Sequence, residues 1–140
     1  MSSSTASTIR PLPEVTPENQ FYWTAGRDGV LRILRCRNCQ YWVNPPGPIC
    51  PQCRSSEVEP AETSGQATVV GYTVNHQQWY PELEVPYVVA VVELPEQVGL
   101  RLVTNIVGCS PDEVRADMPV TVTFVQVEDV WIPVFEPAEA

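Results

Sequence analysis

Three features of the sequence predict a mainly β fold for this chain. Fifteen prolines stand against seven glycines among 140 residues, which favours loops, edges and extended segments over long helices. From about residue 66 onward, apolar and polar residues alternate as they do in half-buried strands. Two Cys-x-x-Cys pairs, separated by ten residues, lie upstream of that pattern. We therefore expect one region organised around the cysteines and a second one organised around an apolar core.

A short helix is predicted near the N-terminus. Thr16 suits the N-cap position, and Pro17 suits the first helical position. Gly26 or Gly29 would end the helix after roughly ten residues. Residues 1–15 are rich in Ser, Thr and Pro, and we expect a disordered or partner-ordered arm there.

Three consecutive aromatic residues, Phe21, Tyr22 and Trp23, lie within the predicted helix. At about 100° per residue they would cover more than half of the helix circumference. Two interpretations remain open: the helix is clamped between two parts of its own chain, or one side of it meets a partner. All three are therefore candidate contacts with a partner or a substrate channel.

The two Cys-x-x-Cys pairs predict one metal site. Each two-residue spacer forms a tight knuckle that turns both sulfurs toward one ion, and four thiolates suit tetrahedral zinc. Two disulfides or a redox pair are the alternatives, but no secretory signal precedes the pairs and no βαβ pattern surrounds them. Four thiolates leave no position for water, so the predicted zinc is structural. Its predicted ligands are Cys36, Cys39, Cys50 and Cys53.

Strands are predicted on both sides of the cysteine pairs and in the C-terminal half. Residues 30–35 and 40–43 would enter and leave the first knuckle. In the C-terminal half, Val70, Tyr72 and Val74 would share one face of a first strand. The β-branched run at residues 88–94 is consistent with a second strand that is covered on both faces.

Three further strands and one short helix complete the predicted C-terminal region. Ser110, Pro111 and the two acids that follow predict a short helix between the third and fourth strands. Four or five strands with a helix at this point are the layout of an OB-type barrel. The third to fifth strands are expected at Leu100–Ile106, Val120–Phe124 and Trp131–Phe135.

The distribution of charge weighs against nucleic-acid binding, which a zinc ribbon joined to an OB-fold would otherwise suggest. All eight basic residues are Arg, and five of them lie in or beside the cysteine region. From Gln66 onward there are two arginines against eleven acids, and the isoelectric point is about 4.4. Phosphates would be repelled over most of this surface.

The titratable residues offer little for independent catalysis. His76 follows the first barrel strand, where a hydrogen-bonded structural role is more common than that of a general base. Cys109 could be a nucleophile, although a small buried thiol is the more common case. The carboxylates are scattered in loops. We therefore expect the chain to be inactive by itself.

A loop between the first two barrel strands carries large apolar residues outside any strand pattern. Trp79, Tyr80 and Leu83 lie there, and an exposed apolar loop is typical of an interaction surface. The alternative is that Trp79 folds back and closes the mouth of the barrel. These three residues are the second set of candidate partner or channel contacts.

The order of these motifs is similar to that of a known family, the acyl-CoA-associated OB-fold proteins with a rubredoxin-like zinc ribbon. The resemblance covers about Thr16 to Phe135, with two departures: Gln40 and Asp117 stand where a glycine is common. The residues that carry the resemblance are Phe21-Tyr22-Trp23, Leu31, Arg35-Cys36, the four paired cysteines, Pro45-Pro46, Gly71-Tyr72-Thr73 and Met118-Pro119-Val120.

The resemblance implies an accessory subunit. Similar proteins pair with a thiolase-fold lipid-transfer-type protein to form an aldolase, which cleaves a steroid side-chain acyl-CoA by a retro-aldol reaction on the partner's residues. A heterotetramer or another hetero-oligomer that shares its acyl-CoA substrate is the expected assembly. An acyl-CoA or protein-binding scaffold for a thiolase or ketosynthase is the alternative, and a nucleic-acid-binding role ranks below both.

The expected organisation follows from these motifs. No apolar segment is long enough to cross a membrane, and reduced thiols suit a cytoplasmic protein. The predicted units are an arm at 1–15, a helix at 16–29, a zinc ribbon at 30–62 and an OB-fold at 63–137.

Overall fold

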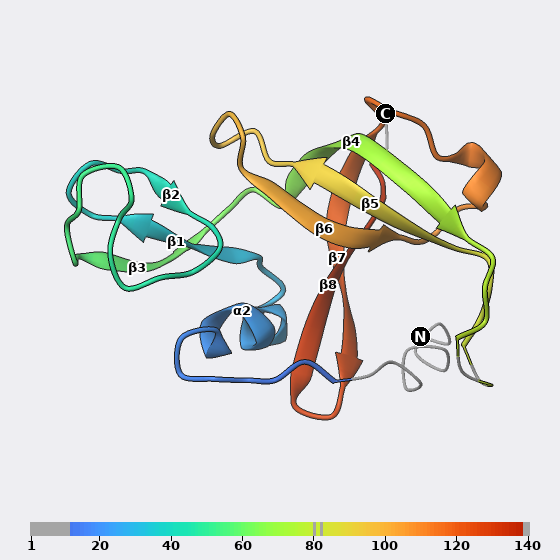
Figure 1. Ribbon diagram of the computed structural model, residues 1–140, viewed down its shortest axis with the longest axis horizontal. Helices are drawn as coiled ribbons and strands as arrows, with labels where there is room; N and C mark the ends of the chain where they lie inside the picture. The colour runs from blue at the N-terminus through green and yellow to red at the C-terminus, as the bar shows by residue number, and fades with distance from the viewer. Residues whose placement is uncertain (1–11, 80, 82, 139–140) are drawn as a thin grey trace.

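The computed structural model describes residues 12–79, 81 and 83–138, and it places a small three-stranded sheet beside a closed five-stranded barrel (Figure 1). The small sheet has the order β2-β1-β3, and the barrel has the order β4-β5-β6-β8-β7. This confirms the predicted mainly β fold. The elements are α2 (Gln20–Thr24), the 3-10 turn η1 (Ala25–Asp28), β1 (Arg32–Cys36), β2 (Trp42–Val43), β3 (Val58–Glu62), β4 (Gln66–Asn75), β5 (Tyr87–Glu93), β6 (Arg101–Ile106), the 3-10 turn η2 (Pro111–Glu113), β7 (Pro119–Val127) and β8 (Val130–Pro137).

The N-terminal helix is shorter than the ten residues that the sequence predicts. Thr16 and Asn19 exchange side-chain to backbone hydrogen bonds of 2.7 and 3.3 Å, the reciprocal pattern of a capping box, and Gln20 N–H donates to the Thr16 carbonyl at 2.9 Å. Residues 17–19 form this turn, and the α-helix itself begins at Gln20 and passes into η1, which ends at Gly29 with a φ of 75°. Within the described residues, neither helical segment has the length and apolarity needed to cross a bilayer.

The ribbon contains one strand that the sequence does not reveal. β3 pairs with β1 over five residues, from Arg32 opposite Glu62 to Cys36 opposite Val58. It carries Pro60 and exposed glutamates, which are unusual in a central strand but acceptable at a sheet edge. Strand β1 is central, and its Ile33 and Leu34 are buried.

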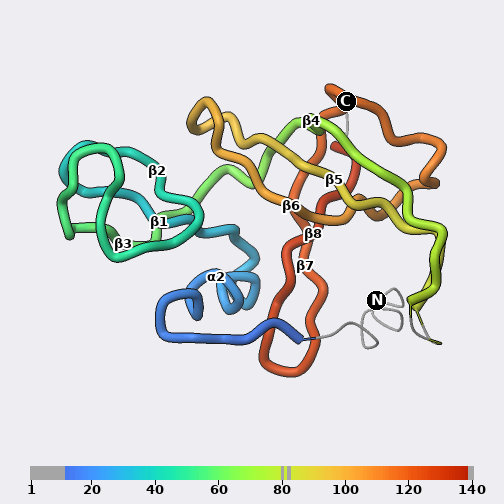
Figure 2. Tube along the Cα trace, in the orientation of Figure 1, coloured from blue at the N-terminus to red at the C-terminus, as the bar shows by residue number. Residues whose placement is uncertain are grey.

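The barrel has the predicted OB-type layout. Antiparallel pairings join β4–β5, β5–β6, β7–β8 and β4–β7, and a parallel contact between Ile106 and Phe135 closes β6 on β8. The predicted helix before β7 is the 3-10 turn η2, in which Ser110 and Glu113 form a capping box. In Figure 2 the β4–β5 connection lies at the end of the molecule opposite the ribbon.

One apolar core spans the ribbon and the barrel. Phe135 is fully buried at its centre, among valines and leucines that alternate along the barrel strands. Leu31, Ile33 and Trp42 from the ribbon side belong to the same cluster. The ribbon is thus fixed to the barrel by packing as well as by the chain.

A bulge in β4 corrects the predicted face of that strand. The register shifts between Val69 and Gly71, so that Val69 is fully buried and Val70 is 40% exposed. Beyond the bulge, Tyr72 and Val74 lie opposite buried residues of β5. Val70 therefore does not share their face, because the inserted residue reverses the alternation that the sequence shows.

Strand β5 is also not covered on both faces within this chain. Its burial alternates strictly along residues 87–93: Val88, Ala90 and Val92 are buried, whereas Val89 and Val91 are only half-buried. The β-branched run therefore has an inner and an outer side. Nothing in the described part of the chain buries the outer side completely.

The helical segment covers the opposite side of the barrel. Segment α2 packs on β8, segment η1 packs on β7 and β8, and Figure 1 shows α2 beside that hairpin. Gly26 allows this approach, because an added Cβ would lie 2.5 Å from Trp131 Cβ and 2.6 Å from Phe124 Cδ1. The Arg27 guanidinium lies 5.0 Å from the Trp131 ring centroid, in a cation–π contact.

Candidate metal centre

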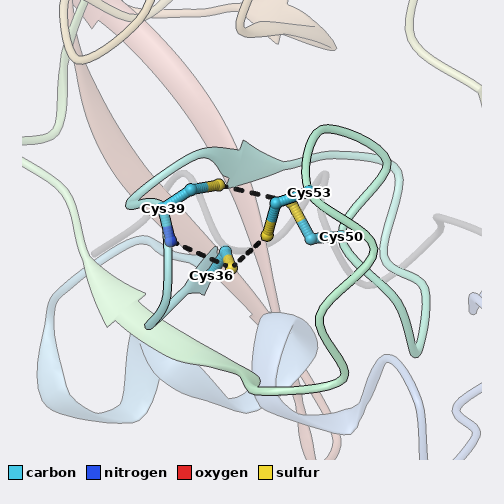
Figure 3. Close-up of side chains that lie close together, drawn as sticks. All are labelled: Cys36, Cys39, Cys50 and Cys53. Atoms are coloured by element: carbon cyan, nitrogen blue, oxygen red, sulfur yellow. Dashed lines mark hydrogen bonds between the residues drawn. The ribbon is translucent and has the colours of Figure 1, made fainter.

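The four predicted ligand sulfurs converge at one point of the ribbon (Figure 3). All four lie within 4.8 Å of one another, and the pairs Cys36–Cys53 and Cys39–Cys50 are each separated by 3.6 Å. A tetrahedral site with Zn–S bonds of about 2.3 Å has sulfurs about 3.8 Å apart. The four thiols are free, so the alternative of two disulfides is wrong. The arrangement fits one tetrahedral ion.

Backbone N–H groups point at the sulfurs from within each knuckle. The N–H groups of Asn38 and Cys39 donate to Cys36 Sγ at 3.3 and 3.4 Å. In the second knuckle, Gln52 N–H donates to Cys50 Sγ at 3.3 Å. Such donors favour thiolate over thiol, and thiolate is the form that binds metal.

Both knuckles turn back through a left-handed residue directly after their second cysteine. Gln40 has a φ of 71° and Arg54 a φ of 68°. Each donates its N–H to the carbonyl of the first cysteine of its pair, at 2.9 and 2.8 Å. Gln40 thus adopts the conformation for which the family often uses glycine, and so does Asp117, with a φ of 67°. The two departures leave the turns intact.

The thiols of the site influence one another's protonation. The Asn38 amide, which donates to Cys53 Sγ at 3.4 Å, lowers the pKa of Cys53 to about 6. The pKa of Cys39 is raised to about 12, since the hydrogen bond from the Tyr41 backbone, which lowers it, is outweighed by desolvation and the neighbouring thiols. Opposite shifts are expected for sulfurs close enough to compete for negative charge, and a divalent cation relieves that competition.

The donor set indicates a structural role for the ion. Four thiolates fill a tetrahedral coordination sphere and leave no position for water or substrate. Cys36 and Cys50 are buried beneath the knuckles, whereas Cys39 is exposed. The chemistry of the ligands and their closed arrangement therefore fit structural zinc, as the sequence predicts.

Two of the arginines around the ribbon form ion pairs with acids. Arg32 forms ion pairs with Asp28 at 3.2 Å and Glu62 at 3.5 Å. Arg37 lies 3.6 Å from Glu59. Strand β3 supplies both glutamates, so acids from beyond the cysteines neutralise two of the five arginines in this region.

The aromatic residues of the helix are half-buried by their own chain. Tyr22 packs against the core, and burial raises its pKa to about 12. The rings of Tyr22 and Trp23 meet edge to face with centroids 4.9 Å apart. Phe21 and Trp23 are also half-buried. Clamping by the chain's own barrel thus accounts for much of this aromatic surface, and the remainder stays a candidate contact.

The β4–β5 connection leaves its tryptophan in solvent. Trp79 is 69% exposed, so it does not close the barrel mouth. The Gln78 amide donates to the carbonyls of Pro81 and Leu83 at 3.0 and 2.8 Å, and Leu83 is half-buried. Tyr80 lies outside the described residues.

His76 and Cys109 are the two remaining candidate catalytic groups. His76 is exposed just after β4. Cys109 is half-buried against the core, and desolvation together with the nearby Glu113 charge raises its thiol pKa. A raised pKa disfavours the thiolate, so Cys109 has the character of a structural thiol.

A residue without any signal in the sequence joins the ribbon to the barrel. Gln97, in the β5–β6 turn, accepts from Trp42 N–H at 2.8 Å and donates to the Trp42 carbonyl at 3.0 Å. Asn44 adds a bond of 3.0 Å to the carbonyl of Arg101. Gln97 thereby pairs with the backbone N–H and carbonyl of Trp42 on the free edge of β2. Only the tertiary fold brings Gln97 to that edge.

Comparison with known families assigns both halves of the chain. Residues 23–59 match the model described as "ChsH2, rubredoxin-like zinc ribbon domain", and residues 61–125 match "ChsH2, C-terminal OB-fold domain". A DUF35 domain-containing scaffold protein of Methanocaldococcus jannaschii is 37% identical over 98 residues, which are 69% of this chain and 68% of that protein. The chain belongs to the ChsH2/DUF35 family.

Two curated members of the family are longer proteins. A probable enoyl-CoA hydratase alpha subunit of Thermomonospora curvata is 41% identical over 131 residues, which are 93% of this chain. The 3-oxo-4,17-pregnadiene-20-carboxyl-CoA hydratase alpha subunit of Mycobacterium tuberculosis is 32% identical over 91% of this chain. The chain spans 40% of the length of each.

Solved structures of the family share the fold. A chain of the "Ltp2-ChsH2(DUF35) aldolase" is 40% identical with a TM-score of 0.82, and the match covers 91% of this chain and all of that one. A DUF35 protein of Sulfolobus solfataricus has a TM-score of 0.61 at 16% identity, which supports the fold alone.

Proposed function

We propose that this chain is a non-catalytic subunit of a CoA-thioester-processing complex, in which a thiolase-fold protein of the Ltp2 type carries the catalytic residues. The reaction that fits best is the retro-aldol cleavage of a steroid side-chain acyl-CoA. One observation carries this proposal: the similar chain in the Ltp2-ChsH2(DUF35) aldolase is matched over its entire length at 40% identity.

The chemistry of the described residues supports an accessory role. The metal centre is a closed four-thiolate site, Cys109 has a raised pKa, and His76 stands alone in solvent at the end of a strand. A hydrolase or lyase centre needs an acid, a base or a nucleophile in mutual contact. The described part of the chain brings no such group together.

A second role has support of its own. The resemblance to two hydratase alpha subunits indicates that the same ribbon and barrel also occur as part of longer CoA-processing chains. The archaeal relatives are described as scaffold proteins. The alternative proposal is therefore a scaffold that binds a thiolase or ketosynthase, or its acyl-CoA, without the aldol reaction.

The contact residues proposed for the partner are those that the chain leaves accessible. Trp79 is the strongest candidate, because it is 69% exposed in the β4–β5 connection. The half-buried Leu83 and the partly exposed Phe21, Tyr22 and Trp23 belong to the proposed set as well. Tyr80, which lies outside the described residues, is proposed from the sequence alone. Trp79→Ala should weaken assembly without lowering the melting temperature, whereas Tyr22→Ala should lower it.

Co-expression with an Ltp2-type protein tests the proposal. The expected result is a stable hetero-oligomer in size-exclusion chromatography that cleaves the hydroxyacyl-CoA of the steroid side chain, with each protein inactive by itself. A stable complex without cleavage would favour the scaffold role. Turnover of the thioester by this chain alone, or full activity of the partner without it, would contradict both roles.

A further inference from the structure

One side of the barrel exterior carries a row of apolar side chains in solvent. On the outer face, Gly71 of β4 pairs with Val91 of β5, which pairs with Val103 of β6. Val103 is 72% exposed, and Val70, the bulge residue beside Gly71, is 40% exposed. We call this surface, with Val89 in the next row, the valine face. Strands in solvent usually place polar residues at such positions.

The valine face lacks charge in a chain that is otherwise rich in it. The protein has seventeen acidic and eight basic residues, yet segments 63–81, 85–92 and 102–111 contain no Asp, Glu, Lys or Arg. The Glu93–Arg101 ion pair of 2.8 Å marks its end near the ribbon. Loss of charge around an apolar centre is the compositional sign of a protein–protein interface core.

The position of the valine face in the fold also indicates binding. In OB-folds, the second and third strands and the loop between the first two strands form the usual ligand surface. Here these elements are β5, β6 and the β4–β5 connection that carries Trp79. Oligonucleotide-binding OB-folds place aromatic and basic residues on this surface. Valines without charge suit an apolar protein surface instead.

The chain covers the β7–β8 side of its barrel with its own helical segment, and not the valine face. Segments α2 and η1 pack on β7 and β8 and cover that side, so the chain's own helix is already engaged. Within the described residues, Val103 therefore stays 72% exposed.

From these observations we propose that the valine face is the docking surface for an uncharged apolar patch of the thiolase-fold partner. This inference rests on the proposed function and adds to it the surface that the partner meets. The half-buried α2 aromatics then serve to cover the chain's own barrel, and the ribbon lies beyond the Glu93–Arg101 end of the contact.

Two valine substitutions form a matched pair that tests this surface. Val103→Glu places a charge on the valine face at its most exposed valine, whereas Val98→Glu places one in the β5–β6 turn, where Val98 is 94% exposed. Binding to the Ltp2 chain of the solved Ltp2-ChsH2(DUF35) aldolase would be measured by biolayer interferometry. Val103→Glu should weaken binding by about tenfold or more, and Val98→Glu by less than about twofold.

The outcomes separate this inference from the proposed function. Equal binding by Val103→Glu and the unchanged chain would overturn the docking surface and leave the proposed function in place. Failure of the unchanged chain to bind Ltp2 would overturn both. A change of Val103→Glu from dimer to monomer in light scattering would show that a second copy covers the face. Melting temperatures verify folding, and Val103→Ala, which adds no charge, should weaken binding in the same direction.

Discussion

The β7–β8 side of the barrel and its β4–β5–β6 side differ in what lies over them. Over β7 and β8, the chain places its own helical segment, with Gly26 against Trp131 and Arg27 stacked on the same ring. Over β5 and β6 the described part of the chain places no such segment, and Val103 remains 72% exposed. Strands of similar composition can thus be covered or exposed on their outer face, and only the neighbouring elements decide which.

The metal centre makes this difference possible. Segments α2 and η1 lead directly into β1, whose last residue is the zinc ligand Cys36. The ribbon is in turn held against the barrel by Trp42 in the core and by the Gln97 hydrogen bonds. The helix is therefore positioned from one end by a small domain that four thiolates keep folded.

Removal of a zinc ligand should have the largest effect. Cys36→Ala should abolish zinc binding and unfold the ribbon, because metal binding to such a site is worth about 10–16 kcal/mol and is coupled to folding. The β7–β8 side of the barrel should then become as accessible to solvent as the β4–β5–β6 side. Zinc content by mass spectrometry and limited proteolysis within residues 30–62 measure this. Cys109→Ala is the control, and it should keep its zinc.

A side chain at Gly26 should disturb the covered side alone. Gly26→Ala brings a methyl group 2.5 Å from Trp131 Cβ, and the overpacking should cost about 1–3 kcal/mol of unfolding free energy. Gly47→Ala is the matched control, because a Cβ there meets nothing within 4 Å. Urea denaturation compares the two variants. Equal stability of both would show that the helix does not pack on the hairpin as described.

A smaller effect is expected from the cation–π contact on the same side. Arg27→Ala should destabilise the protein by about 0.5–1 kcal/mol, because the guanidinium loses its contact with Trp131. Arg115→Ala, at an exposed position after η2, should change the unfolding free energy by less than about 0.5 kcal/mol. If Arg115→Ala lowered the unfolding free energy as much as Arg27→Ala, the contact with Trp131 would not explain the destabilisation of Arg27→Ala.

Local patterns in the sequence suffice for the metal centre and for most barrel strands. The Cys-x-x-Cys spacing predicts the ligands because each knuckle is a local turn, and Leu102 and Ile106 are buried on one face as their alternation predicts. Ser110 and Glu113 likewise form their capping box within four residues. The signal in each case lies within the segment that it describes.

Features that depend on distant contacts are not predictable in this way. Strand β3 has a composition unsuited to a strand and forms because β1 offers it an edge. The bulge at Val70 reverses the face of β4, and Gln97 reaches Trp42 across 55 residues of sequence. The exposed outer side of β5 is the same kind of case, since its residues alone predict a strand covered on both faces.

Hydroxyl-radical footprinting of the free chain and of its complex with an Ltp2-type partner tests the account most directly, because it reports the solvent exposure of individual side chains. The account predicts that labelling of Val103 and Trp79 falls on binding, while that of Val98 and of the helix-covered Trp131 stays unchanged. Protection at Trp131 with undiminished labelling of Val103 would contradict it.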